Sequence, residues 1–318
     1  MPPTCTCTAL RTVTGSSWAP ETLFFQQSGG SRIVSPTWNL VADFQQVFQY
    51  EFMQNAFIAG TIVAILAGVV GYFVVLRRLS FASEALAHGG FAGATGAVVL
   101  GQDVFLGLLA FTSVTGAFMG VLGDRLRGRD VAIGGTLAFS LALGSLFLTI
   151  STRFAGQAVN ILFGNILAIA TNDVRFVALF AVLALCALGV MFRPLLFASV
   201  DAEIADARGV PVRLLSVAFM VLLAITVSAS VQVVGVLLIF ALMILPAAAA
   251  QHITAQPSQA IGLAVVLAVL YVWAGLLVGF YLPYPPSFFI TAFAFVTFLG
   301  VRTLLTGVAG GTRSRSRS

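Results

Sequence analysis

From about residue 56 onward, long apolar stretches alternate with short polar connections. Most stretches are about 20 residues long, the length that an α-helix needs to cross the hydrocarbon core of a membrane. One stretch, 214–250, has no charged residue and is long enough for two crossings, with the break expected at Ser228–Gln232. The pattern predicts spans at about 56–76, 81–100, 104–123, 131–150 and 174–192, two within 214–250, and two more at 260–280 and 288–305.

The predicted fold is therefore an all-α, polytopic integral membrane protein with about nine transmembrane helices. Eight are expected if two of the spans merge. Residues 151–173 mix Gly, Asn and apolar residues, and we expect a loop with a short or re-entrant helix there.

Composition supports the same class of protein. Apolar residues make up 59% of the 318 residues and charged residues 8%, and the mean hydropathy is +1.03. A soluble domain carries roughly 25% charged residues, so a soluble protein is excluded. The net charge of +5 comes from arginine alone, because the chain has no lysine. No aromatic residues are interleaved with the basic ones as in a nucleic-acid site, so no nucleic-acid partner is expected.

The arginines are distributed unevenly, and this predicts the orientation. With nine crossings and the N-terminus outside, the outer side contains Arg153 and Arg175 in its loops, beyond Arg11 and Arg32 of the N-terminal extension. The inner loops and the tail contain Arg77, Arg78, Arg125, Arg127, Arg129, Arg193, Arg208, Arg213, Arg302, Arg313, Arg315 and Arg317. Because cytoplasmic loops are enriched in arginine, we expect the N-terminus outside and the C-terminus in the cytoplasm. A further crossing within 151–173 would reverse every later loop, so we reject it.

Three parts of the chain follow from this pattern. Residues 1–40 are rich in Ser, Thr, Pro and Gly and are expected to form a disordered N-terminal extension. Residues 41–306 form the transmembrane domain, and an amphipathic helix at 38–48, which overlaps its start, would lie in the membrane interface. Residues 307–318 are expected to form a disordered Arg/Ser tail in the cytoplasm.

Glu84 and His88 are ionisable residues inside the second predicted span. Their i, i+4 spacing places both side chains on one face of a helix, and helix rise puts His88 about 15 Å beyond Arg78, near the membrane midplane. Such residues are costly in a membrane and usually functional. Since carboxylate and imidazole are ligands for divalent first-row metals, we predict a metal-contacting pair. The alternative is that Glu84 reaches the inner interface and His88 is a satisfied core histidine.

The same span carries small residues at helical spacing. Ala85, Gly89, Gly93 and Ala97 follow a small-xxx-small pattern, which allows helix backbones to approach closely. We therefore expect Gly89 and Gly93 to pack against a neighbouring helix beside the ligand pair.

A short polar helix is predicted between two spans. Asp201 is suited to its N-cap, while Glu203 near its start and Arg208 near its end complement the helix dipole. Gly209 is a natural stop after the last turn. Such a helix could dock a cytoplasmic partner, and the alternative is an ordinary polar loop.

At these segments the chain resembles the membrane subunits of ABC importers for manganese, zinc and ferrous iron. In Leu76–Gly93 it matches the family pattern LRR-[LM]-S…D-A-L-S-H…PG, with Glu84 in place of Asp and Ala92 in place of Pro. Pro283–Pro286 replaces a D-x-P-S-G-like turn. Further matches follow in order from about residue 47 to 300, at Ala132–Gly134, Leu162–Ala168, Arg193–Leu195, Asp201–Val210, Val233–Leu238 and Leu245–Ala250.

The resemblance implies a homodimeric permease in the bacterial cytoplasmic membrane, with a cytoplasmic ATPase and an extracytoplasmic metal-binding protein as partners. Glu84 and His88 would contact the Mn²⁺, Zn²⁺ or Fe²⁺ ion in transit, and no cofactor would be bound permanently. The helix with Asp201, Glu203, Ala205, Arg208 and Gly209 would couple to the ATPase.

Without lysine the chain cannot form a GxxxxGK[ST] phosphate loop, so it is expected to have no ATP site and to be no enzyme. The alternative function is a proton-coupled secondary metal transporter that uses Glu84 and His88 as a proton relay.

Overall fold

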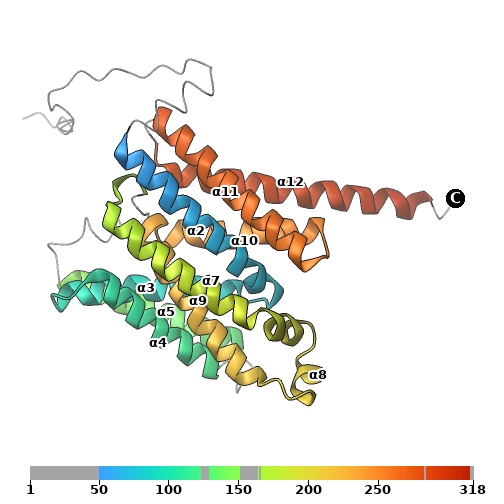
Figure 1. The fold of residues 1–318 in the computed structure, drawn as a ribbon, viewed down its shortest axis with the longest axis horizontal. Coiled ribbons are helices and arrows are strands. Elements are labelled where there is room, and N and C mark those ends of the chain that lie inside the picture. The colour runs from blue at the N-terminus through green and yellow to red at the C-terminus, as the bar shows by residue number, and fades with distance from the viewer. Residues whose placement is uncertain (1–49, 123–128, 151–163, 165, 283, 316–318) are drawn as a thin grey trace, which may run out of the picture. The chain divides into compact units, whose positions relative to one another are not determined.

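All regular elements in the described part of the chain are helices. The computed structural model describes residues 50–122, 129–150, 164, 166–282 and 284–315 (Figure 1), which belong to one unit, Pro36–Ser318. The extension predicted at 1–40 and the interfacial helix predicted at 38–48 lie outside these residues. The long helices are α2 (Glu51–Leu76), α3 (Ser80–Val99), α4 (Val104–Leu122), α5 (Arg129–Ile150), α7 (Thr171–Val200), α9 (Val212–Val234), α10 (Val236–Ile253), α11 (Pro257–Tyr281) and α12 (Pro286–Arg315); the short ones are η2 (Ile166–Ala168) and α8 (Ala202–Ala207).

The all-α, polytopic class predicted from the sequence is confirmed. Of the long helices in the described residues, 8 have the length and hydropathy of a membrane span. The remaining long helix, α3, has 20 residues, which is long enough to cross a membrane of ordinary thickness. Within the described residues, the number of transmembrane helices is therefore nine if α3 crosses the membrane and eight if it does not. Which end faces the cytoplasm remains a prediction.

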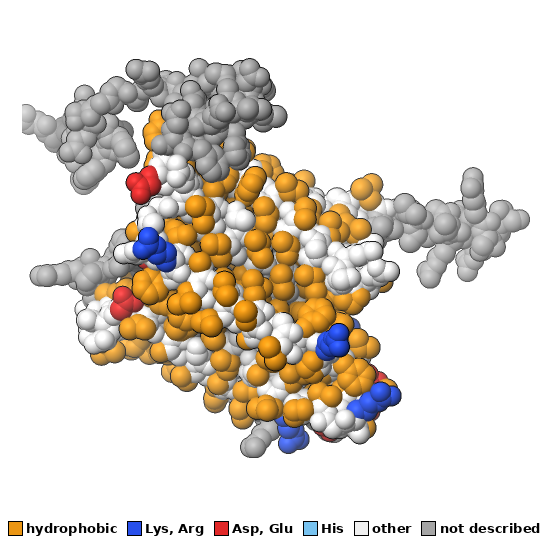
Figure 2. All heavy atoms as spheres, viewed as in Figure 1, with side chains coloured by type: hydrophobic (Ala, Val, Ile, Leu, Met, Phe, Trp, Pro, Cys, Tyr) orange, Lys and Arg blue, Asp and Glu red, His pale blue; other side chains and the backbone are white. Residues whose placement is uncertain are grey.

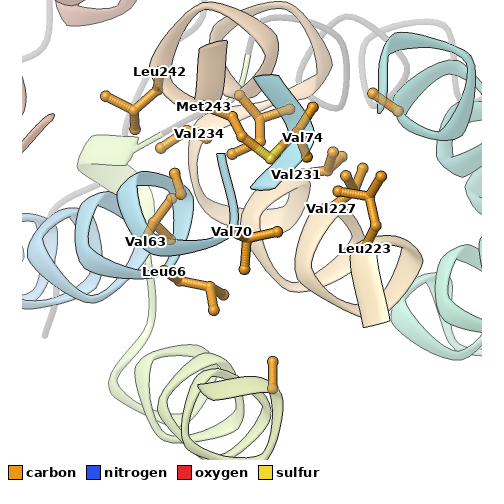
Figure 3. Packing of buried hydrophobic residues seen from close by; sticks show 14 of the residues in the cluster. Val63, Leu66, Val70, Val74, Leu223, Val227, Val231, Val234, Leu242 and Met243 are labelled. Carbon is orange, nitrogen blue, oxygen red and sulfur yellow. The ribbon is translucent and has the colours of Figure 1, made fainter. Parts of the chain in front are cut away.

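Helix α2 is the central helix. It packs against α7, α9, α10 and α11, and most of its residues are buried, while a stripe of Ile58, Ile62, Ile65 and Val69 is exposed or partly exposed. Figure 3 shows its side chains meeting those of α9 and α10. The labelled residues of this cluster are Val63, Leu66, Val70 and Val74 from α2, Leu223, Val227, Val231 and Val234 from α9, and Leu242 and Met243 from α10.

Two glycines let the neighbouring backbones touch α2 directly. A β-carbon at Gly68 would lie 2.8 Å from Val265 Cα in α11, and one at Gly71 would overlap Met243 O in α10. Side chains cannot fit at these crossings, so the helices meet through main-chain atoms. This close packing replaces the hydrophobic driving force that is absent between helices in lipid.

One end of the bundle carries the arginines that follow α2. Arg77 Nη2 donates a hydrogen bond to Ser216 Oγ (3.2 Å), and its guanidinium lies 5.4 Å from the centre of the Phe219 ring. The end of α2 and the start of α9 therefore lie together, next to α8 (Figure 1). We call this the arginine end.

Polar contacts join the helix termini at the opposite end. Asn55 Nδ2 donates to Thr171 Oγ1 (3.2 Å), and Gln232 Nε2 donates to Asp173 Oδ1 (3.3 Å). The starts of α2 and α7 and the end of α9 thus lie together. In the face drawn in Figure 2, hydrophobic side chains cover the middle and charged ones lie near two opposite margins, as expected for a protein that spans a membrane.

The break between α9 and α10 corrects a prediction. It falls at Gly235, which has φ 83°, and not at Ser228–Gln232. Ser228 stays helical because its hydroxyl donates to Ala224 O (2.8 Å) within α9. The left-handed conformation at the break is one that glycine adopts without steric cost.

Two other helices end later than the sequence pattern predicts. Helix α7 continues past Pro194 to Val200, where the fifth span was expected to stop at 192. Proline removes one backbone donor, which membrane helices tolerate when neighbouring groups compensate. Helix α12 continues to Arg315, into the segment 307–318 that was expected to form the tail.

The contact at Gly71 can be tested by adding one methyl group. Gly71→Ala should destabilise the protein by about 3 kcal/mol, because α10 must move away from α2. The matched control is Gly262→Ala in α11, where a β-carbon meets nothing within 4 Å. That variant should be slightly more stable, by about 0.5–1 kcal/mol. Thermal unfolding in detergent measures both, and equal stabilities would contradict the backbone contact.

Candidate metal-transit site

Glu84 and His88 lie one turn apart on α3, a helix that packs against several others. The helix begins at Ser80, directly after the arginine end of α2. With a rise of about 1.5 Å per residue, His88 lies about 12 Å into a helix of 20 residues. Glu84 lies one turn closer to the arginine end.

Helix α3 is enclosed on nearly every side except along this pair. It packs against α4, α5, α9 and α10. From Ala82 to Ala97 every residue is buried except Glu84 and His88, which are partly exposed. The surrounding helices therefore leave uncovered the two positions that carry ionisable groups.

The pair has the properties of an incomplete ligand set. The Glu84 carboxylate interacts electrostatically with His88, and Nδ1 of His88 is buried with no hydrogen-bond partner. Within the described residues, no group of three or more His, Cys, Asp or Glu side chains comes together. Each chain thus offers one carboxylate and one imidazole here, fewer ligands than a tight metal site uses.

The two glycines predicted to pack beside the pair have different surroundings. At Gly93 a β-carbon would lie 2.5 Å from Gly107 O and 2.6 Å from Phe111 Cβ, so the backbones of α3 and α4 are in contact. At Gly89 the nearest atoms would be 3.8 Å away, in Thr115 and Ser140. Gly93 brings two helices together, whereas Gly89 borders a small space.

The short helix predicted between two spans is α8, and its caps are formed as its sequence suggests. Asp201 Oδ1 accepts hydrogen bonds from the backbone N–H groups of Glu203 (3.1 Å) and Ile204 (3.0 Å). At the other end Gly209 has φ 82°, and Val210 N donates to Ala205 O (3.0 Å). This is a Schellman C-cap, so α8 is a defined helix and not an irregular loop.

Helix α8 presents polar and apolar side chains outward. Ala205 is fully buried, whereas Ile204 is 50% exposed. Arg208 lies over the Phe197 ring of α7, with its guanidinium carbon 6.0 Å from the ring centre. Ile204 was not singled out from the sequence. Ile204 is the only large apolar residue in this short helix with defined caps, and this feature of the sequence could have identified it.

The polytopic, all-helical fold is consistent with a membrane transport protein of the permease type. The chain belongs to the ABC 3 transport family, since the family model matches residues 49–304. In this family the chain is the membrane component of the transporter and not its ATPase. The resemblance found in the sequence is thereby confirmed.

Similar proteins agree with this assignment. The manganese transport system membrane protein MntC of Halalkalibacterium halodurans is 30% identical over 239 residues, covering 75% of this chain and 82% of that protein. The manganese import system permease protein ScaB of Streptococcus parasanguinis is 34% identical over 203 residues, covering 64% and 72%. A chain in the structure of PsaBC from Streptococcus pneumoniae in complex with Fab superposes with a TM-score of 0.74 at 30% identity, covering 82% and 94%.

The N-cap of α8 can be tested on its own. Asp201→Ala should cost about 1 kcal/mol of local stability, because two backbone N–H groups lose their acceptor. Amide hydrogen exchange of residues 202–207 should become about fivefold faster. Glu203→Ala is the control, since its exposed side chain does not cap the helix, and it should leave exchange nearly unchanged. Unchanged exchange in Asp201→Ala would show that the cap does not stabilise α8.

Proposed function

We propose that this protein is the permease subunit of an ATP-driven importer that moves divalent manganese ions into a bacterial cell. The observation that carries this proposal is the placement of Glu84 and His88 at the two partly exposed positions of α3 between Ala82 and Ala97. A carboxylate oxygen and an unpartnered imidazole nitrogen can both bind a divalent first-row metal. Because the set is incomplete, binding stays weak enough for release, as transport requires.

Manganese is favoured among the possible ions by the relatives. MntC and ScaB carry manganese in their names. The donor atoms alone would also suit Zn²⁺ or Fe²⁺. Glu84 stands where the family pattern has Asp, and it supplies the same carboxylate on a side chain longer by one methylene.

A second copy of the chain is the occupant we propose for the uncovered face of α3. One chain contributes two ligands, and two copies related by a twofold axis contribute four, which completes a coordination set. The ion would then pass between the two copies, bound by Glu84 and His88 of each.

The other partners are assigned to the two ends of the bundle. An extracytoplasmic metal-binding protein would deliver the ion at the end opposite the arginines. The arginine end would face the cytoplasm, in keeping with the enrichment of arginine in inner loops. There, α8 would contact the ATPase that supplies the energy, through the exposed Ile204 and Glu203.

Removing either ligand tests the site. Glu84→Ala and His88→Ala should each lower manganese uptake by about tenfold or more, since even outer-shell changes at metal sites cost that much. Uptake of radioactive Mn²⁺ into cells lacking their own importer measures this. Wild-type uptake in both variants would remove the assignment of these residues.

Two controls accompany this experiment. Glu84→Asp should retain most uptake because it keeps the carboxylate, and Glu51→Gln, an exposed residue in the first turn of α2, should be unaffected. Loss of the ATPase should abolish uptake. Uptake that survives without the ATPase and stops on adding a protonophore would instead indicate a proton-coupled transporter.

The proposed role of α8 is tested at its exposed apolar residue. Ile204→Asp should leave the fold intact because the side chain is half exposed, yet it should prevent stable contact with the ATPase by placing a charge in an apolar interface. Co-purification of the ATPase should fall about tenfold, and transport with it. The control is Leu214→Asn, an exposed residue at the start of α9. Full co-purification with Ile204→Asp would contradict the assignment of α8.

A further inference from the structure

Helices α3 and α5 meet through a regular series of phenylalanine–glycine contacts. A β-carbon at Gly134 would lie 3.6 Å from the Phe81 ring, and one at Gly144 would lie 2.7 Å from the Phe91 ring. Further along, Phe147 packs 2.9 Å from the corresponding position of Gly96. The interface is therefore apolar on both sides of the ligand pair, and it is tightly filled at Gly144 and Gly96.

One layer of this interface is different. Between the contacts at Gly134 and Gly144, α5 presents Ser140, which is 1% exposed. Its Oγ atom is buried and has no hydrogen-bond partner. Serines in membrane helices usually bond their own backbone, as Ser228 does with Ala224 O. A buried hydroxyl without a partner is costly, so its presence in an apolar interface needs an explanation.

The hydroxyl of Ser140 borders the space at Gly89, together with a second hydroxyl. A β-carbon at Gly89 would lie 3.8 Å from Ser140 Oγ and 3.8 Å from Thr115 Oγ1 of α4. Three helices thus converge on a small space with two hydroxyl groups at its edge. The space at Gly89 can hold a methyl group without a clash, whereas at Gly93 a methyl group would overlap the backbone of α4.

This space adjoins His88. Gly89 is the next residue along α3, with its Cα about 3.8 Å away, and Nδ1 of His88 is also buried without a partner. Ser140 and Gly89 meet at one level of the α3–α5 interface, one residue from His88. A divalent ion bound at His88 holds its water oxygens at roughly 2.1–2.5 Å, and a hydrogen bond adds about 2.8 Å. The two hydroxyls would form hydrogen bonds with those of its waters that extend toward Gly89.

Absence of a partner alone would not identify a site. On α9, Thr226 and Ser230 are also fully buried, and their hydroxyls have no partner. What distinguishes Ser140 is its place beside His88, at the edge of a space that a β-carbon would fill.

We propose that Ser140 and Thr115 are positioning residues that hold the remaining water ligands of the manganese ion beside His88. This inference rests on the proposed function. Hydroxyl groups both donate and accept hydrogen bonds, so they can hold water on a partly hydrated ion without binding the metal directly. They would lower the cost of removing the rest of the hydration shell, and Gly89 would leave the room that these waters need.

The experiment uses the complete transporter, with its ATPase and metal-binding partners, and measures uptake of radioactive Mn²⁺ over a range of concentrations. Ser140→Ala and Thr115→Val should each raise KM by about tenfold and change the maximal rate by less than twofold. Thr115→Ser keeps the hydroxyl and should retain a KM within about twofold of wild type. Gly89→Ala fills the space with a methyl group at ordinary contact distances, so it should raise KM while the protein stays folded.

The matched control is Thr136→Val on α5, one turn before Ser140. The Thr136 hydroxyl donates to Ala132 O (2.8 Å), so it is satisfied within its own helix and its removal should not change KM. A purely structural role for Ser140 predicts the opposite of our result. Removing an unpartnered buried hydroxyl would then raise the thermal midpoint and leave transport unchanged.

The outcomes separate this inference from the proposed function. Unchanged KM in Ser140→Ala and Thr115→Val, with uptake lost in His88→Ala, would overturn the hydroxyl proposal and keep the transit site. Unchanged uptake in His88→Ala would overturn both. If Ser140→Ala fails to reach the membrane, Thr115→Val against Thr115→Ser decides the same question, because both variants preserve most of the threonine shape.

Discussion

Direct contact between helix backbones is the interaction on which this structure depends. In lipid, apolar side chains gain little by moving from hydrocarbon to protein, so helices associate through close packing. Here α10 and α11 touch α2 at Gly71 and Gly68, and α4 touches α3 at Gly93. These contacts hold main-chain atoms against each other and fix the helix positions more firmly than flexible side chains could.

The same packing defines the candidate site. Because α3 is enclosed by four neighbours, almost every residue in its middle is buried, and Glu84 and His88 remain partly exposed. A helix held this tightly cannot turn its ionisable residues away from the uncovered face. The rigid surroundings therefore fix the depth of Glu84 and His88 in the bundle and leave both side chains partly exposed.

Polar groups within the membrane fall into two kinds. Most hydroxyls are satisfied by their own helix, such as Thr61 with Phe57 O (2.6 Å) and Thr95 with Phe91 O (2.9 Å). A smaller set, which includes His88 Nδ1 and Ser140 Oγ, is buried without a partner. Groups of the first kind stabilise the fold locally, whereas those of the second kind carry a cost that function can offset.

The sequence by itself determined the class of fold and most of the helices, and it singled out Glu84 and His88, whose role as metal ligands stays a prediction. Span length follows from membrane thickness, and i, i+4 spacing follows from helix geometry, so local pattern suffices for α2, for the pairing of Glu84 with His88, and for the caps of α8. The break at Gly235 and the continuation of α7 past Pro194 were not predicted, because a hydroxyl or a proline can be satisfied within a membrane helix. Only the tertiary structure decided that, between Ala82 and Ala97, α3 is buried everywhere except at its two ionisable residues. It also decided that Ser140 and Thr115 lie beside Gly89, since those contacts join residues of three helices and leave no periodic signal in any one of them.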